Sequence, residues 1–385
     1  MGILRLVTFV FFPIIRISGF PVPLAMFYIF LRKIEFYKSY FYPLFFSSLY
    51  FLFMIVLNNF EQIEITDLAY SIFPLVYLVL IHSFYKLKNL EKIIKIYFFF
   101  NIGIVSITWI LNYTPYILSF YYNNYVFGNI TSENHYMRII ENRGIGLVGH
   151  PAWLGLMSYL LGKFLSIKEN KYKYVLFSFI SITLSGARAA LFILVLLEAI
   201  GLIIKNRKNL VKLAFFLTIF IIAISIGFSF VYHVNDSFRY WIEITMLDLK
   251  YGNGFRSDSI AHRIEMFTLL FENNLISILF GGGILSESIN ILETGIAIDS
   301  ELVLRTLQYG LLGYFMLFLP IFVAMQRAKK FKNEVGKEIT IFILLFSFLG
   351  SLTTTILSNM IFIIYISIMI AIVEQINASN YNKIG

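Results

Sequence analysis

Long runs of apolar residues recur from one end of the chain to the other, separated by polar connections. The runs reach roughly 15 to 25 residues, and about 20 residues of α-helix cross the hydrocarbon core of a bilayer. We therefore predict an all-α polytopic membrane protein with 11 or 12 transmembrane helices. The predicted spans after the N-terminal region are 40–57, 68–85, 93–111, 147–166, 174–187, 189–205, 210–232, 302–325, 338–357 and 359–376.

The N-terminal region, residues 1–31, is apolar but contains Pro13, Gly19 and Pro21, which end helices. Because membrane backbone must still be hydrogen-bonded, two interpretations stay open. One is a single kinked span, and the other is a hairpin of two short spans that turns at Ser18–Pro23. No small-residue cleavage site follows the apolar stretch, so we expect this region to belong to the mature protein.

Composition supports the membrane interpretation and excludes several classes of function. The chain is 59% hydrophobic and 14% charged, whereas about a quarter of the residues of soluble domains are charged. The net charge of +9 is scattered between apolar runs and forms no basic face for nucleic acid. The absence of cysteine excludes disulfides, thiolate metal sites and a Cys nucleophile.

Charge alternates between successive connections, and this alternation predicts the topology. The connections 32–39, 86–95, 163–173, 205–212, 326–338 and the C-terminal tail hold 21 Lys and Arg. The intervening segments hold eight basic and 15 acidic residues. The positive-inside rule places the first set and the C-terminus in the cytoplasm. The N-terminus is then inside for 12 spans and outside for 11.

The two long connections therefore face outward, and any chemistry is expected on that side. Loops of this length are usually functional or disordered, and we expect the second to fold into a cap with short amphipathic helices. The predicted divisions are N-terminal transmembrane helices 1–111, a first extracytoplasmic loop 112–146, central transmembrane helices 147–232, a large extracytoplasmic loop 233–301, C-terminal transmembrane helices 302–376 and a cytoplasmic tail 377–385.

Basic residues differ in type between the two predicted faces. The cytoplasmic connections hold 18 Lys and three Arg, whereas the outer segments hold one Lys and seven Arg. Arginine offers a planar fork of donors that fits phosphate oxygens, so the outer set predicts a polyanionic ligand. For any single arginine, pairing with an outer acid is the alternative. The seven are Arg138, Arg143, Arg188, Arg239, Arg256, Arg263 and Arg305.

Arg188 lies between two apolar runs that are each too short to cross the core, so we expect its turn to lie below the outer surface. A charge at that depth marks a functional site by default. The alternative is an arginine that reaches outer lipid headgroups.

Residues 143–155 combine an arginine, four glycines and a proline at the start of an apolar run. Gly146, Gly149 and Pro151 suit a tight start of a helix, whose positive N-terminus would help Arg143 to hold an anion. His150 is a candidate proton acceptor there. A histidine bonded only to backbone is the alternative.

The second outer loop adds His262, Arg263 and Asp299. Gly281-Gly282-Gly283 lacks the ending of a phosphate-binding loop and is better explained as a turn. Asp299 is a candidate general base because a desolvated carboxylate can accept a hydroxyl proton. Asp299 and Glu301 could instead be helix caps, with Glu301 four residues before Arg305. Arg305 is counted among the candidate substrate-binding residues, and Gly310 and Gly313 are expected to permit close helix contact.

Taken together and in order, these segments resemble the O-antigen polymerase and ligase superfamily over residues 143 to 315. The segments are Arg143-x-x-Gly146 leading to His150-Pro151, Ser185-x-x-Arg188-x-x-Leu191, Arg263 before Phe280-Gly-Gly-Gly283, and Asp299-Ser300-Glu301 running into Gln308-Tyr309-Gly310-Leu311-Leu312-Gly313.

The resemblance implies a glycosyltransferase of the bacterial inner membrane, with a GT-C-like fold and no metal or other cofactor. It would move a glycan from an undecaprenyl diphosphate donor to a lipid-linked acceptor, building a surface polysaccharide such as O-antigen or capsule. Arg143, Arg188 and Arg263 match family arginines that hold diphosphate and glycan. A chain-length regulator protein is an implied partner, and nucleic acid is not.

Two rival functions stay open. Ligases of the family commonly carry His-Asn where this chain has Asp299-Ser300, which favours a polymerase over a ligase. A flippase for the same lipid-linked oligosaccharide would also need buried arginines, but it predicts little outer structure, against the two long outer loops. The candidate bases of the polymerase are Asp299, His150 and His262.

Overall fold

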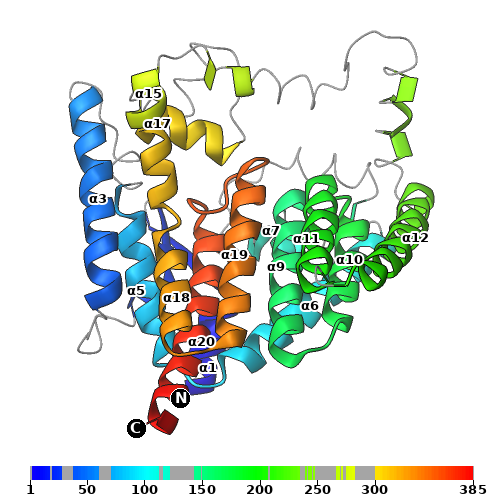
Figure 1. The fold of residues 1–385 in the computed structure, drawn as a ribbon, viewed down its shortest axis with the longest axis horizontal. Coiled ribbons are helices and arrows are strands. Elements are labelled where there is room, and N and C mark those ends of the chain that lie inside the picture. The colour runs from blue at the N-terminus through cyan, green and yellow to red at the C-terminus, as the bar shows by residue number, and fades with distance from the viewer. Residues whose placement is uncertain are drawn as a thin grey trace. The chain divides into compact units, whose positions relative to one another are not determined.

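The structure is a computed structural model of the 385-residue chain. It describes residues 2–17, 20–27, 38–59, 71–111, 116–121, 143–148, 150–206, 209–234, 239–240, 242–244, 246–247, 266–268, 270–271, 275–281 and 300–384. Helices make up most of this part (Figure 1). The chain divides into two compact units, a first unit of Met1–Ile93 with Asp258–Gly385 and a second unit of Ile94–Ser257.

Several helices of the described part have the length and composition of membrane spans, which confirms a helical membrane protein. Five helical stretches reach this length, and each overlaps a predicted span: Lys38–Leu57, Leu90–Leu111, Arg188–Asn206, Glu301–Lys330 and Met360–Asn380. Shorter apolar helices overlap three further predicted spans, at Phe73–Tyr85, Lys173–Ser185 and Ile224–His233. The total of 11 or 12 crossings stays a prediction.

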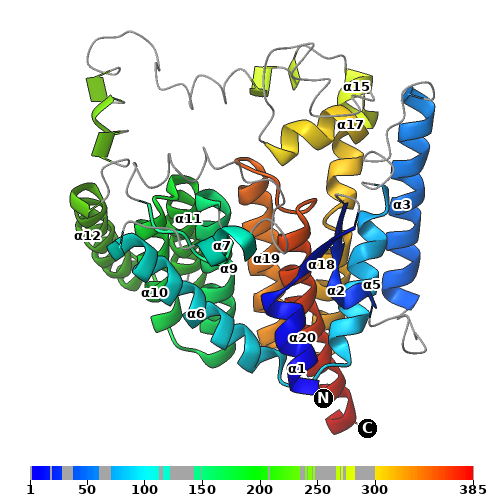
Figure 2. The same cartoon turned by 180° about the vertical axis from the view of Figure 1, so that it is seen from behind.

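In the first unit, α20 is the central helix and is buried over most of its length (Figures 1 and 2). It packs against α5, α18 and α19, and α3 packs against α5, α17 and α18. Helices of this unit are α1 (Gly2–Phe11), α2 (Leu24–Phe27), α3 (Lys38–Asn59), α5 (Phe73–Tyr85), α15 (Leu275–Phe280), α17 (Glu301–Met316), α18 (Leu319–Lys330), α19 (Glu334–Ser351) and α20 (Met360–Ile384).

The N-terminal region contains an antiparallel β-hairpin in place of the predicted kinked span or pair of helical spans. Strands β1 (Ile14–Ile17) and β2 (Phe20–Pro23) pair with Ile14 opposite Pro23 and Ile17 opposite Phe20. Prolines cannot continue a helix but are tolerated in a strand that is not paired on both sides, and β-branched isoleucines favour strands. The all-α prediction is therefore wrong for these eight strand residues.

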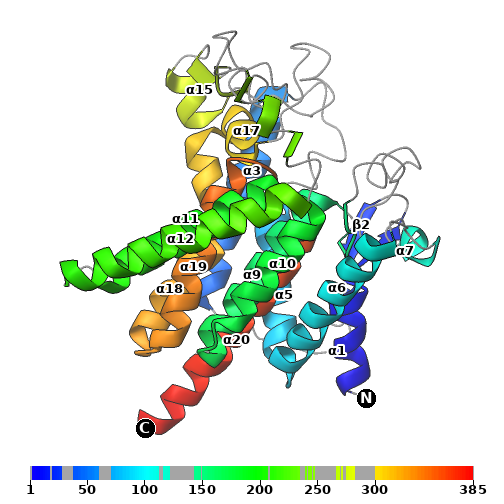
Figure 3. The same cartoon turned by 90° about the vertical axis from the view of Figure 1, so that its right-hand side faces the viewer.

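The second unit is a helical bundle whose main contact is between α9 and the helix that follows it, α10. Helix α12 packs along α11, as Figure 3 shows, and its remaining surface is apolar and exposed. The helices are α6 (Leu90–Leu111), which begins in the first unit, α7 (Tyr116–Tyr121), α9 (Pro151–Glu169), α10 (Lys173–Ser185), α11 (Arg188–Asn206) and α12 (Leu210–Val234).

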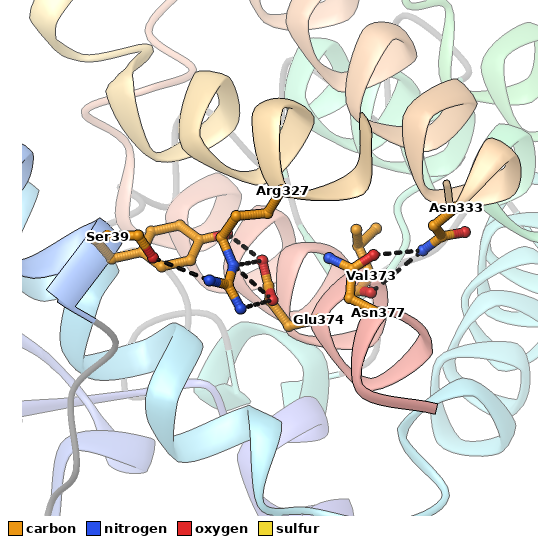
Figure 4. A network of polar contacts seen from close by, with 7 residues as sticks. Ser39, Arg327, Asn333, Val373, Glu374 and Asn377 are labelled. Atoms are coloured by element: carbon orange, nitrogen blue, oxygen red, sulfur yellow. Dashed lines mark hydrogen bonds and ion pairs between the residues drawn. The ribbon is translucent and has the colours of Figure 1, made fainter. Parts of the chain in front are cut away.

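Polar networks connect the helices inside each unit. In the first unit, the buried carboxylate of Glu374 in α20 binds Arg327 of α18 and the hydroxyl of Tyr40 of α3 (Figure 4). In the second unit, Glu198 of α11 binds Lys163 and Tyr159 of α9. Each carboxylate is satisfied by partners on other helices, as a buried charge requires.

Candidate functional site

Residues 143–148 form an irregular segment, the 143–148 segment, whose backbone is bonded to helices of the second unit. The Gly144 amide donates to the Leu184 carbonyl of α10 at 2.7 Å. The Ile145 amide donates to the Thr108 hydroxyl of α6 at 2.8 Å. Gly144 to Val148 are buried, whereas Arg143 is half-buried at the start of the segment. The segment therefore holds Arg143 at the end of α10.

Helix α9 begins sharply at Pro151, as predicted. Pro151 occupies the first helical turn, and His150 before it has an extended backbone (φ −83°, ψ 125°) whose carbonyl accepts from the Leu154 amide at 2.8 Å. Proline is favoured there because its missing amide hydrogen needs no partner. The rings of half-buried His150 and Trp153 lie 5.2 Å apart. Gly149 lies outside the described residues.

The turn between α10 and α11 is closed by Gly186 in the left-handed region (φ 65°). The Gly186 amide donates to the Thr183 carbonyl, and the Ala187 amide donates to the Ile182 carbonyl. This pair of bonds ends α10 and allows α11 to begin at Arg188. At 19 residues α11 is long enough to cross a membrane, so the prediction that both flanking helices are too short holds only for α10, with 13.

The start of α9 lies against this turn. A Cβ atom on Gly155 would fall 2.4 Å from the Cβ of Ala187 and 2.8 Å from that of Ala190. Because Gly155, Ala187 and Ala190 have no side-chain atoms beyond Cβ, the N-terminal parts of α9 and α11 can approach closely. Arg143, His150 and Arg188 therefore lie at one end of the second unit.

Two helix N-termini and two arginines lie at this end of the second unit, beside the C-terminus of α10. The first amide groups of α9 and α11 lack partners within their own helices, and each helix N-terminus carries about half a positive charge. The half-buried side chains of Arg143 and Arg188 add two formal charges. In the described part of the second unit, these residues and two helix starts form the best candidate site for an anion.

Arg305 belongs to the first unit and is 2% exposed. Its guanidinium donates to the side chains of Gln308 in α17 and Ser358, with the Ser358 bond at 2.8 Å. These contacts give Arg305 a structural role in the first unit, and its assignment as a substrate-binding residue stays a prediction.

The sequence alone indicates Glu301 only as a candidate helix cap with i,i+4 spacing to Arg305. Its carboxylate is fully buried and accepts the amides of Ile356, Leu357 and Ser358 at 2.8, 2.7 and 2.6 Å. Because the backbone leaves the helix to make these bonds, α19 ends at Ser351 and the predicted span 338–357 is too long. The N-cap of α17 is Ser300. An acid next to a predicted membrane span was the signal that could have identified Glu301.

The glycines of the predicted turn and of the following span meet each other. Gly281 has φ +93° at the end of α15, and a Cβ atom there would fall 2.5 Å from the Gln308 carbonyl oxygen. Gly310 has φ +73° and interrupts α17. Gly313 lies against Tyr50 and Phe51 of α3. The predicted close contacts at Gly310 and Gly313 are confirmed, whereas the predicted turn continues at Gly282 and Gly283, which lie outside the described residues.

The other predicted site residues, Asp299, His262 and Arg263, lie outside the described residues. Within the described ranges, no group of three His, Asp or Glu side chains is placed to hold a metal ion. The structure thus groups Arg143, His150 and Arg188 and locates Arg305 in the first unit.

No protein-family model matches the chain, and no curated protein matches its sequence significantly.

Proposed function

We propose that this protein is a glycosyltransferase that polymerises a surface polysaccharide such as O-antigen or capsule. The observation that carries the proposal is the hydrogen bond between Gly144 and Leu184, which brings Arg143 to the end of α10 that leads into Arg188. Two arginines and two helix N-termini at one end of a helical unit suit a diphosphate, which presents oxygens on two adjacent phosphorus atoms.

In the proposed reaction, the donor is a glycan on undecaprenyl diphosphate and the acceptor is a sugar hydroxyl of a second lipid-linked repeat unit. The acceptor oxygen attacks the anomeric carbon while the bond from that carbon to the diphosphate oxygen breaks. The bonding electron pair leaves with the diphosphate, whose growing charge Arg143 and Arg188 neutralise. A displacement of this kind inverts the anomeric centre.

The hydroxyl proton needs a general base, and the candidates are His150, Asp299 and His262. Of these, His150 lies at the start of α9, beside the proposed anion site and half-buried. Arg263 is proposed as a further glycan or diphosphate contact. The proposal places the reaction on the outer face of the bacterial inner membrane, in a GT-C-like fold with a chain-length regulator as partner and no cofactor.

Purified full-length protein in lipid nanodiscs, given lipid-linked repeat units, should produce a ladder of longer glycans. Replacing Arg143 or Arg188 with alanine should lower the rate of chain growth at least tenfold, because each substitution removes a positive charge that stabilises the leaving diphosphate. Lys212→Ala, which removes an exposed charge in a predicted cytoplasmic connection, is the control and should keep the wild-type rate.

Three results would overturn the proposal. An unchanged ladder in both Arg143→Ala and Arg188→Ala would show that these arginines do not bind the donor diphosphate. Transfer of single units to a different acceptor, without growth, would indicate a ligase. Movement of the intact lipid across the bilayer without transfer would indicate a flippase.

A further inference from the structure

The 143–148 segment runs inside the second unit without regular secondary structure, at the level of membrane-spanning α6. Irregular backbone is tolerated at membrane depth only where protein groups satisfy its polar atoms, because lipid offers no hydrogen bonds. Besides the bond from Gly144 to Leu184, two side chains of α6 supply such groups. They are Thr108 and Asn101, and both are almost fully buried, at 4% and 1% exposed.

Thr108 contacts both polar atoms of Ile145. Its hydroxyl oxygen lies 2.8 Å from the Ile145 amide nitrogen and 2.8 Å from the Ile145 carbonyl oxygen. The hydroxyl accepts the amide proton and has one proton of its own, for which the Ile104 and Val105 carbonyls of α6 also compete. A single side chain thus fixes the residue that lies two positions after Arg143.

Asn101 anchors the segment a second time. Its Oδ1 accepts the Leu147 amide at 2.7 Å, and its Nδ2 donates to the Ser158 hydroxyl of α9 at 3.3 Å. Ser158 in turn shares a hydrogen bond of 2.9 Å with Ser181 of α10. The amide side chain therefore connects α6, the segment, α9 and α10.

The two anchors define the path of the segment. Ile145 pairs with Thr108 and Leu147 with Asn101, so the segment runs antiparallel to α6. Gly144 and Gly146 permit this path, since a Cβ atom would fall 2.7 Å from the Val105 carbonyl oxygen at Gly144 and 2.5 Å from Asn101 Oδ1 at Gly146. The anchored residues lie two and four positions after Arg143.

We propose that Thr108 and Asn101 are positioning residues that set the place of Arg143 in the anion site. This inference rests on the proposed function, because it assigns their effect to binding of the diphosphate. A charge that must meet a leaving group loses much of its effect when it is displaced by about 1 Å. Thr108 and Asn101 touch no ligand themselves, so their substitution acts through Arg143.

The test compares Thr108→Val, which keeps the shape but removes the hydroxyl, with Thr108→Ser, which restores it. The probe is a fluorescent undecaprenyl diphosphate, titrated into full-length protein in nanodiscs. Thr108→Val should weaken binding about tenfold, and Thr108→Ser should return it to within threefold of wild type. Asn101→Leu is the second, independent variant and should also weaken binding. Thr340→Val, in which a buried threonine loses only a bond within α19, should leave binding unchanged.

A double-substitution cycle separates positioning from loss of folding. If Thr108 acts through Arg143, Thr108→Val should add less than twofold to the weakening already caused by Arg143→Ala. Wild-type binding in folded Thr108→Val and Asn101→Leu, alongside weakened binding in Arg143→Ala, would overturn this inference and leave the proposed function standing. Wild-type binding in Arg143→Ala and Arg188→Ala would instead remove the proposed function, and this inference with it.

Discussion

Gly144 and Leu184 are joined by a backbone hydrogen bond of 2.7 Å between residues 40 positions apart in the sequence. The bond connects an irregular segment to the last turn of α10, one residue from Arg143 and four residues before Arg188. The bond brings the backbone near Arg143 to the end of α10, and Arg188 follows that end as the first residue of α11. The arrangement depends on a glycine, because the Val105 carbonyl leaves no room for a side chain at position 144.

Gly144→Ala should therefore disrupt the site. The new Cβ atom would lie 2.7 Å from the Val105 carbonyl oxygen and 3.2 Å from the Leu184 carbonyl oxygen, so the segment must move. We expect a loss of about 2 kcal/mol in the free energy of unfolding, as overpacked sites show. Unfolding by sodium dodecyl sulfate, followed by circular dichroism, measures the change.

Gly103→Ala in α6 is the matched control for this substitution. No atom lies within 4 Å of the position of its new Cβ, so alanine should be neutral or stabilise the helix by up to about 1 kcal/mol. Equal destabilisation by the two substitutions would show that the close contact at Gly144 does not cause the loss in the free energy of unfolding.

Glu301→Gln should loosen the connection between α19 and α20. The amide group replaces one carboxylate oxygen with a donor that would face backbone amides, so at least one of the three hydrogen bonds is lost. Hydrogen bonds to a charged acceptor are worth about 1.5 to 3 kcal/mol each, and we expect a loss of about 3 kcal/mol. Hydrogen exchange should become faster at the amides of residues 356–358.

A surface substitution provides the comparison for Glu301. Glu334 lies in the first turn of α19 and is exposed, so Glu334→Gln should leave exchange at residues 356–358 unchanged. Unchanged exchange in Glu301→Gln as well would mean that its carboxylate does not hold this segment.

Arg327→Ala should destabilise the first unit by about 3 kcal/mol. Arg327 Nε lies 2.9 Å from both carboxylate oxygens of Glu374 (Figure 4). Removal of the arginine leaves a fully buried carboxylate that still accepts a hydrogen bond from the Tyr40 hydroxyl. Arg327→Lys should recover only part of the loss, because an ammonium cannot reproduce the two-oxygen contact.

The double variant Arg327→Met with Glu374→Met tests the origin of that loss. Replacing both charges with apolar side chains removes the uncompensated charge, so this protein should be more stable than Arg327→Ala. The opposite order of stability, measured by the same unfolding assay, would show that packing of Arg327 against Tyr40 and Phe331 dominates.

Acid should weaken the end of α9 that carries Glu169. Hydrogen bonds from Lys95 and Tyr174, both of 2.6 Å, lower the pKa of Glu169 to about 2, whereas a glutamate in an unfolded chain titrates near pH ~4.3. Since the folded state binds this proton more weakly, the stabilisation is complete above about pH 5 and is lost as the pH falls from there to about 2.

Thermal unfolding in detergent between pH 7 and pH 3 checks this prediction. Glu169→Gln should show a smaller loss of stability over that range than the wild type, and high salt should reduce the difference because Lys95 is partly exposed. Parallel pH profiles of the two proteins would exclude Glu169 as a source of acid sensitivity.

Local features of the fold could be predicted because they depend on neighbouring residues. Pro151 starts α9, and Gly186 closes the turn before Arg188, through backbone preferences that belong to these residue types. The pairing of strands 14–17 and 20–23 was missed because prolines exclude a helix without specifying what replaces it. The end of α19 was missed because an apolar run does not reveal where backbone amides leave the helix.

By itself, the sequence determined that the protein is helical and lies in a membrane, and it identified the arginines that deserve a functional test. Apolar length and charge alternation suffice for this, since each span must satisfy its own backbone in lipid. Only the tertiary structure decided that Arg143 and Arg188 share one helix end, that Arg305 is buried, and that Glu301 holds the chain before α20. These relationships join residues far apart in the chain, and they arise from how closely the helices pack, which no local pattern encodes.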